Sequence, residues 1–416
     1  MSETCNSRHF SWLMKSCFPN PNDKSLTITP HPHPPPTTLS SLPDDLLLEC
    51  LSRVPSSSLP SVSLVCRRWS RLLLSHSFLL LRRQLCLTHP SVFAFSANDS
   101  GIFTATLSLI DSSWELSLCL PSNTLSLHSI PRLAAIGPRI YIIARNSMLR
   151  FDSWTRSVVA RSPMIFPRRK FASAVLFHKI YVAGGGRSEA ASAVEEYDPK
   201  IDTWRVVSNA PRRRYGCIGA AVDGIFYVIG GLKIGGECGN DSSRAAATGL
   251  EANMYASSMD LYDVEARAWL RSRAVPGGGC VVAACAAGGY LYILASHAVE
   301  LSFWRFDARR KYCSGNDGGA AGSGGFGEWC RIRSPPMPTQ IKLDSTVRFS
   351  FVGVGSKVVL VQVVGCIDDL LRRSGRSERG MKEGLVLVYD SVGGEWRRAA
   401  DLPEVIRRAA CVSVEC

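Results

Sequence analysis

The chain has 416 residues, of which 46% are hydrophobic and 20% charged, a composition typical of a folded protein with sizeable cores and two or three domains. Its formal net charge of +13 suits acidic partners, although charge alone does not indicate nucleic-acid binding. The N-terminal segment lacks the apolar core of a signal peptide and no uncharged apolar run reaches membrane length, so we expect a protein of the cytoplasm or the nucleus, neither secreted nor membrane-spanning.

The first predicted element is a tail over residues 1–39, which ends in the proline-rich stretch "TPHPHPPPTTLS". Proline fixes φ and removes the backbone donor, so this stretch forms neither helix nor sheet, and we predict that the tail is disordered. His31 and His33 lie among these prolines, and we interpret them as solvated side chains rather than metal ligands.

A helix is predicted in the stretch "LPDDLLLECLSRVP" at residues 42–55. Pro43 fits a first helical position, and two aspartates follow it, where the positive end of a helix favours acidic groups. Apolar residues then recur at helical spacing at Leu46, Cys50 and Val54. The stretch therefore predicts a short amphipathic helix.

Two further short helices are predicted before residue 87. One runs from Ser58, a suitable N-cap, to Leu73, and the other carries Phe78, Leu81 and Leu85. Three short helices bury too little surface to be stable alone, and they carry more leucines than their own core needs. Those leucines either pack on the rest of the chain or form a surface for a partner.

The stretch "LPDDLLLECLSRVPSSSLPSVSLVCRRWSRLLLSHSFLLLR" resembles an F-box, and residues 40–86 match the length and register of that family. The resemblance implies a domain that docks on the Skp adaptor of cullin-RING ubiquitin ligases. Two departures are mild: Cys50 stands where the family usually has isoleucine, and Pro60 is unusual in the second helix. The adaptor-binding residues that the resemblance implies are Leu42, Pro43, Leu46, Leu47, Cys50, Leu51, Leu59, Leu64, Val65, Cys66, Trp69 and Phe78.

From residue 89 onward the chain reads as short apolar strands with turns, and a pattern repeats. Tyr-Asp pairs precede tryptophan in "YDPKIDTW", "YDVEARAW" and "YDSVGGEW", and "IYVAGGG" and "FYVIGG" lie further upstream. A degenerate unit has Arg156 in place of the tryptophan. The spacing of a tryptophan, six residues and a proline starts at Trp114, Trp204, Trp269, Trp329 and Trp396.

These di-glycine, Tyr-Asp and Trp elements resemble kelch repeats over residues 89–416. The resemblance implies an all-β six-bladed propeller after the small all-α F-box, with one four-stranded blade for each unit. Glycine pairs would then allow close strand packing, so we do not interpret Gly184–Gly186 or Gly230–Gly231 as phosphate-binding loops. The first unit offers only three strands, and we predict that residues 409–416 supply the fourth and close the ring.

Strand alternation puts the loops between blades on one face of a propeller. These loops are basic in "FPRRKF", "APRRRYG", "TVRF" and "VIRRAA", whereas "PGGGC" interrupts the pattern. Insertions at 232–257 and 366–384 fall on the same face, and a glycine-rich insertion at 314–327 falls opposite. Either these cations pair with local carboxylates, or they bind an acidic or phosphorylated substrate segment. We predict that the substrate-binding residues are Arg168, Arg169, Lys170, Arg212, Arg213, Arg214, Tyr215, Arg348, Arg407 and Arg408.

An F-box and kelch repeats in one chain resemble a plant-type architecture, the substrate receptor of an SCF (Skp–cullin–F-box) ubiquitin ligase. The resemblance implies a non-catalytic protein that holds a protein substrate for ubiquitin transfer and degradation, with a Skp-type adaptor and a cullin-RING ligase as partners. No cofactor and no metal are predicted. A kelch binding or scaffold protein that acts without a ligase is the main competing hypothesis.

A propeller oxidase and a nucleic-acid binder are less favoured hypotheses. An oxidase needs a cluster of metal ligands, and His89, His128, His178 and His297 have no spacing that indicates one. The 15 cysteines lack the paired Cys-x-x-Cys spacing of a zinc site, and we interpret them as free thiols in a reducing compartment. Strong, salt-dependent binding to generic RNA or DNA would be needed to favour the nucleic-acid hypothesis.

Overall fold

The structure of the chain is a computed structural model. It describes residues 39–415 apart from 99–100, 121–130, 187–191, 234–254, 298–299, 310–326, 338–347, 365–383 and 407. The predicted disordered tail, up to residue 38, lies outside the described residues, as do most of the three insertions. The chain divides into two compact units, Met1–Leu51 and Ser52–Cys416.

The first unit contains the short helix η1 (Leu39–Ser41) and all but the last residue of α2 (Asp44–Ser52). Leu47 and Leu51, four residues apart, are buried, so α2 has the amphipathic pattern that the sequence predicts. Val54, the last residue of the predicted apolar series, lies beyond the end of this helix.

The second unit begins with helices, and the predicted helix from Ser58 to Leu73 is split in two. The chain turns at Leu64–Cys66, where Cys66 is extended and its Sγ accepts a hydrogen bond from the Trp69 backbone N–H at 3.5 Å. This cap begins a new helix, because it satisfies a donor that has no partner within the helix. The helical elements are η2 (Ser56–Ser58), α3 (Leu59–Ser63), α4 (Arg67–Leu73) and α5 (His76–Gln84).

Helix α5 is anchored within the second unit by a buried arginine. The Arg82 guanidinium donates hydrogen bonds to the carbonyl oxygens of Ser52 at 3.2 Å and Val54 at 2.8 Å. It also lies 5.5 Å from the centre of the Trp154 ring, and Trp154 packs edge-on against Phe78 of α5 at 5.2 Å. Because Trp154 belongs to the β-sheet region, these contacts fix α5 against one blade.

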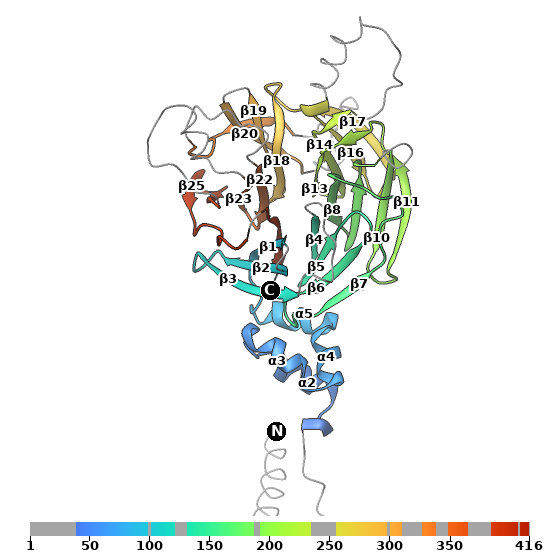
Figure 1. The fold of residues 1–416 in the computed structure, drawn as a ribbon, viewed down its shortest axis with the longest axis vertical. Helices are drawn as coiled ribbons and strands as arrows, with labels where there is room; N and C mark the ends of the chain where they lie inside the picture. Colours follow the sequence, from blue (N-terminus) through green and yellow to red (C-terminus); the bar gives the residue numbers. More distant parts are fainter. Residues whose placement is uncertain are drawn as a thin grey trace, which may run out of the picture. The chain divides into compact units, whose positions relative to one another are not determined.

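Residues 90–415 form six four-stranded antiparallel sheets, which are the six predicted blades (Figure 1). Numbered from the N-terminal end, blade 1 is β26 (Ala410–Glu415), β1 (Pro90–Asn98), β2 (Gly101–Ser108) and β3 (Ser113–Leu120). Blade 2 is β4 (Arg132–Ile136), β5 (Arg139–Ile143), β6 (Met148–Asp152) and β7 (Val158–Arg161). Blade 3 is β8 (Ala172–Leu176), β9 (Lys179–Ala183), β10 (Ala193–Asp198) and β11 (Thr203–Asn209).

Blade 4 is β13 (Ile218–Val222), β14 (Ile225–Ile229), β16 (Ser258–Asp263) and β17 (Ala268–Ala274). Blade 5 is β18 (Cys280–Ala287), β19 (Tyr290–His297), β20 (Glu300–Asp307) and β21 (Trp329–Ile332). Blade 6 is β22 (Arg348–Val354), β23 (Lys357–Val364), β24 (Val386–Asp390) and β25 (Glu395–Arg398). A separate two-stranded ribbon joins β12 (Arg214–Tyr215) to β15 (Leu232–Lys233).

The ring closes through the C-terminal strand, as the sequence predicts. Strand β26 pairs antiparallel with β1, from Ala410 opposite Phe95 to Glu415 opposite Pro90. The first strands of the blades contact one another in the order β26, β4, β8, β13, β18 and β22, and β22 contacts β26 again. We call these six the inner strands, and the residues at or just before their starts the rim. Blade 1 therefore joins the two ends of the propeller sequence.

The tryptophans of the repeat join neighbouring blades. Trp204 of blade 3 donates from Nε1 to the Ser162 carbonyl oxygen, which follows blade 2, at 2.8 Å. Arg156, which replaces the tryptophan in blade 2, reaches Glu115 of blade 1 at 2.7 Å. An ion pair thus takes the place of an indole hydrogen bond there. Cross-blade hydrogen bonds of the indole type also come from Trp114, Trp269 and Trp396.

Candidate binding surfaces

In the first unit, α2 presents a partly apolar surface. Leu46 is 51% exposed, and Pro43 and Cys50 are also exposed, whereas Leu47 and Leu51 are buried. The predicted adaptor-binding residues of this helix therefore lie on two faces, and only one face is open to a partner.

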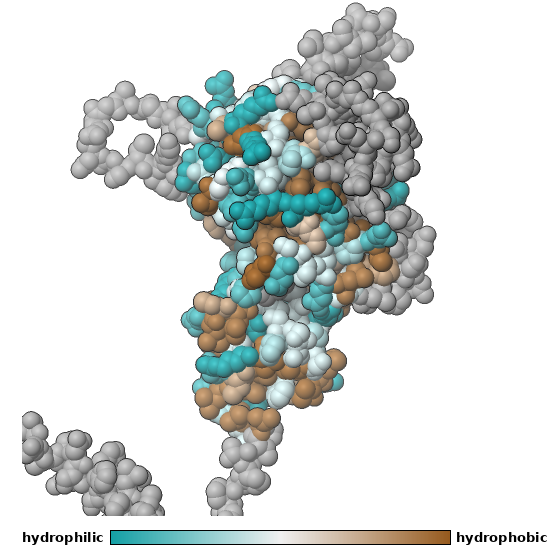
Figure 2. Space-filling model, turned by 90° about the vertical axis from the view of Figure 1, so that its left-hand side faces the viewer, coloured by the Kyte–Doolittle hydropathy of each residue, from teal (hydrophilic) through white to brown (hydrophobic). Residues whose placement is uncertain are grey.

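In the second unit, the connection between α3 and α4 exposes two consecutive aliphatic side chains. Leu64 is 85% exposed and Val65 is 61% exposed. Their backbone N–H groups donate to the carbonyl oxygens of Ser61 at 3.1 Å and Val62 at 3.3 Å, so the turn that presents them is held in place. Hydrophobic residues gather at the surface of the helical segment in Figure 2. Such a concentration is typical of a surface that a partner covers.

The remaining predicted adaptor-binding residues are also divided between buried and exposed positions. Leu59 and Phe78 are buried in the second unit, so they support the helices from within. Cys66 is exposed, and Leu42 and Trp69 are partly exposed.

In the propeller, the loop before blade 3 carries a buried arginine. Arg168 is 1% exposed, and its Nε donates to Glu195 Oε1 at 2.8 Å. Its two terminal nitrogens donate to the carbonyl oxygens of Gly184 and Ala193, both at 2.8 Å. Burial lowers the pKa of the Arg168 guanidinium, and the charge of Glu195 opposes that effect. These hydrogen bonds replace the ones to water that the guanidinium loses on burial, so its donors are satisfied inside the blade.

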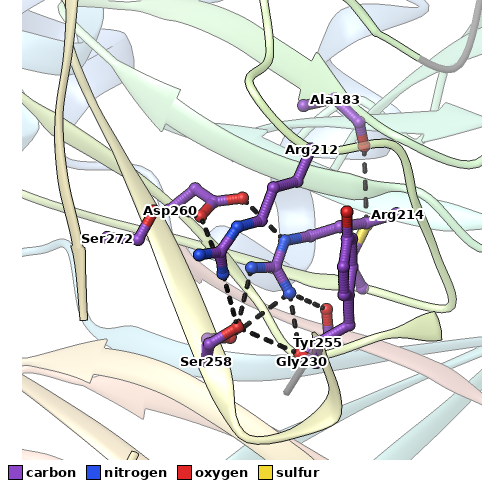
Figure 3. Close-up of polar contacts among 9 residues, drawn as sticks. Ala183, Arg212, Arg214, Gly230, Tyr255, Ser258, Asp260 and Ser272 are labelled. Atoms are coloured by element: carbon purple, nitrogen blue, oxygen red, sulfur yellow. Dashed lines mark hydrogen bonds and ion pairs between the residues drawn. The ribbon is translucent and has the colours of Figure 1, made fainter. Parts of the chain in front are cut away.

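The loop before blade 4 repeats this arrangement (Figure 3). Arg214 is fully buried, and its Nε donates to Asp260 Oδ2 at 2.7 Å. Its Nη1 donates to the carbonyl oxygens of Gly230 and Tyr255, both at 2.8 Å, and Nη2 donates to Ser258 Oγ at 2.9 Å. The sequence predicts that Arg168 and Arg214 contact a substrate, and their burial corrects that expectation: they hold the loops from inside.

The two loops are bonded to each other and rest on the glycine pairs. The Arg169 N–H donates to the Gly185 carbonyl oxygen at 2.9 Å, and the Gly185 N–H donates to the Arg214 carbonyl oxygen at 2.8 Å. Gly184 has φ of +73°, and a Cβ on it would lie 2.7 Å from the Arg214 carbonyl oxygen. A side chain at that position would displace the loop, so the glycine serves packing, as the sequence predicts.

The loops that Arg168 and Arg214 hold from inside carry other cations at the surface. Arg169, Lys170 and Arg213 are exposed, and Lys170 Nζ lies 5.6 Å from the ring centre of the half-buried Tyr215. Arg212 is half-buried, donates to Ser258 Oγ at 3.0 Å and lies 3.7 Å from Asp260. Arg348 and Arg408 are also exposed at the rim, and Arg407 lies outside the described residues.

One rim cation is not among the residues predicted from the sequence. Arg132 begins β4, and its Nε donates to the Phe171 carbonyl oxygen at 2.8 Å while Nη2 donates to the Cys217 carbonyl oxygen at 3.2 Å. Its guanidinium therefore reaches from blade 2 to the starts of blades 3 and 4. The stretch "IPRLAA" has the same Pro-Arg step before an inner strand as "FPRRKF", and that shared step could have identified it.

Among the residues that the structure describes, no group of three or more His, Cys, Asp and Glu side chains is arranged to hold a metal ion. None of the helices in the same residues combines the length and the apolarity needed to cross a bilayer.

Comparison with known proteins finds two families in the chain. The F-box domain family matches residues 39–81, and the Kelch motif family matches residues 167–211. The F-box/kelch-repeat protein At5g26960 of Arabidopsis thaliana is 62% identical over 429 residues, with 100% of each chain covered. The F-box/kelch-repeat protein At1g67480 of the same plant is 27% identical over 46% of this chain and 54% of its own length. A solved structure described as "Structure of YjhT" has a TM-score of 0.44 and 16% identity, over 67% of this chain and 86% of that one.

Proposed function

The chain belongs to the F-box/kelch-repeat proteins, and on that basis we propose that it is the substrate-recognition subunit of an SCF-type ubiquitin ligase. The F-box binds a Skp-type adaptor, which connects it to a cullin-RING ligase. The propeller binds the protein that is to be ubiquitinated and degraded. Proteins of this family are generally non-catalytic adaptors, and this one acts by positioning its substrate in the cytoplasm or the nucleus.

The observation that carries the proposal is the exposure of Leu64 and Val65 within the residues that match the F-box family. Each leaves a large apolar area in water, which is unfavourable by about 25 cal/mol for each Å² unless a partner covers it. The same chain also forms a closed propeller, so it offers a second and chemically different surface.

The second surface is basic, which favours an acidic substrate segment. We assign contact with the substrate to the surface cations and the adjacent tyrosine. Arg168 and Arg214 support those residues from inside the blades. The assigned residues are Arg169, Lys170, Arg212, Arg213, Tyr215, Arg348 and Arg408. Arg407 lies outside the described residues, and its assignment rests on the sequence alone.

A binding assay with a purified Skp-type adaptor tests the first half of the proposal. The variant Leu64→Asp/Val65→Asp should weaken adaptor binding by at least about 100-fold, because it puts two charges into an apolar contact. Both residues are exposed, so the fold should be retained. The matched control, Arg169→Glu/Arg213→Glu, should bind the adaptor as the wild type does. Equal adaptor binding by all three chains would contradict the role of Leu64 and Val65, and a wild-type chain that does not bind the adaptor would overturn the proposal.

The competing function is that of a kelch binding or scaffold protein that acts without a ligase. The two functions differ in the fate of the propeller's partner. In the proposed function, the partner accumulates when the proteasome is blocked, whereas a scaffold leaves its abundance unchanged.

A further inference from the structure

The guanidinium of Arg132 is held at the rim by two of its nitrogens, and the third has no hydrogen-bond partner among the described residues. The carbonyl oxygens of Phe171 and Cys217 accept from Nε and Nη2, and they fix the plane of the group. Nη1 has no hydrogen-bond partner among the described residues. Two backbone contacts across neighbouring blades thus preorganise a donor whose side chain is only partly buried.

No carboxylate among the described residues offsets the charge of Arg132. Burial lowers its pKa most, Cys217 opposes that effect, and the positive charge of Arg348 lowers the pKa further. Arg348 begins the inner strand β22, so a second arginine of the rim lies near enough to repel the first. This differs from Arg168 and Arg214, each of which is neutralised by a buried carboxylate.

A third cation occupies the sector between these two arginines. The inner strand β26 contacts both β4 and β22, and Arg408 lies two residues before its start. Arg408 is exposed and has a φ of +52°, a left-handed conformation that arginine adopts at some cost. The inner strands of blades 6, 1 and 2 are neighbours, so their starts carry Arg348, Arg408 and Arg132 in spatial order. From its strand start, the Arg132 guanidinium extends to the starts of blades 3 and 4.

We propose that Arg132, Arg348 and Arg408 form a binding site for a phosphate group. Planar guanidinium groups bind phosphate oxygens through paired hydrogen bonds, and three of them match the charge of a dianion better than that of a single carboxylate. The inference rests on the proposed function in one respect, the molecule that bears the phosphate group. If the propeller binds a protein substrate, that group belongs to a phosphorylated side chain of the substrate. A soluble phosphate compound presents the same chemistry.

Calorimetric titration of the full chain with pyrophosphate, in buffers of matched ionic strength, tests the site. The variants Arg348→Gln and Arg408→Gln should each weaken binding by about tenfold or more, because each removes a charged donor. Arg271→Gln is the matched control, since it removes an exposed arginine on the outer strand β17, outside the rim, and it should bind as the wild type does. Arg132→Gln should also weaken binding, but thermal denaturation must first show that its loop contacts are not needed for folding.

Two results would overturn the site. One is the absence of pyrophosphate binding beyond the effect of matched chloride. The other is an equal loss in Arg271→Gln and Arg348→Gln, which would mean that the overall positive charge of the chain, not this site, binds pyrophosphate. A serine-containing acidic peptide, with and without phosphate on the serine, then identifies the carrier. Selective binding of the phosphorylated form supports a substrate side chain, and binding of pyrophosphate alone supports a soluble compound. Adaptor binding is measured separately, so failure of this site leaves the proposed function standing.

Discussion

The apolar surface at Leu64–Cys66 and the basic surface at the rim are built in different ways. The first comes from one short stretch, where backbone hydrogen bonds span three residues and a Cys66 cap starts the next helix. The second is assembled from loops that are far apart in the sequence and meet only because the ring closes. A local surface survives changes elsewhere in the chain, whereas an assembled surface depends on the whole propeller.

Removal of residues 410–416 tests this difference and should have the largest effect on stability. Blade 1 would lose its inner strand, and β1 and the neighbouring inner strands β4 and β22 would lose their partner. We expect the ring to lose its cooperative fold, which thermal denaturation followed by near-ultraviolet circular dichroism measures. An unchanged melting transition in the truncated chain would show that ring closure does not hold the rim together.

A smaller effect on stability distinguishes the buried arginine beneath the basic surface from the exposed arginine beside it. Arg214→Met removes the closer of the two ion-pair partners of the buried Asp260 and leaves only Arg212 at 3.7 Å. We therefore expect the free energy of unfolding to fall by about 3 kcal/mol, the lower end of the range for a broken buried ion pair. Arg213→Met is the neighbouring exposed position and should change it by less than about 0.5 kcal/mol. Urea denaturation gives both values. Similar values for the two variants would contradict the assignment of Arg214 to the interior.

The fold could be predicted from the sequence because its signals are local and repeated. The tryptophan spacing identified the blades. Because the first kelch repeat offers only three strands, the C-terminal strand could be identified as the fourth strand of blade 1. The split of the second helix was missed, because helical spacing continues through Leu64–Cys66 and the cysteine cap gives no pattern.

The site was harder to predict, because burial of a charge depends on partners distant in sequence. Arg213 and Arg214 are adjacent and chemically identical, yet among the described residues only Arg214 of the two pairs with a carboxylate, Asp260 of β16. The sequence alone therefore predicts the same role for both. Arg132 was missed for the same reason, because its contacts with Phe171 and Cys217 exist only after three blades are in place.

The smallest effect concerns the link between α5 and the closing strand. Arg83 Nε donates to Glu415 Oε1 at 2.7 Å, and this hydrogen bond lowers the pKa of Glu415 below its ordinary value of 4.5. The ion pair therefore stabilises the fold above that value and is lost as the pH falls through the lower folded pKa. Since both side chains are partly exposed, Glu415→Gln should cost at most about 1 kcal/mol at neutral pH.

Unfolding measurements at neutral pH and at acidic pH check this sign. The difference between Glu415→Gln and the wild type should shrink as the pH falls. A difference that grows on acidification would contradict the assigned ion pair.

The central claim is that the apolar and basic surfaces bind different partners, and a three-bait pull-down from proteasome-blocked cells tests it most directly. The baits are the wild type, Leu64→Asp/Val65→Asp and Arg169→Glu/Arg213→Glu. We predict that the first variant loses the Skp-type adaptor and cullin but keeps the remaining partners, which accumulate. The second variant should keep the adaptor and lose those partners. Loss of the same proteins from both variants, or no adaptor on any bait, would contradict the account.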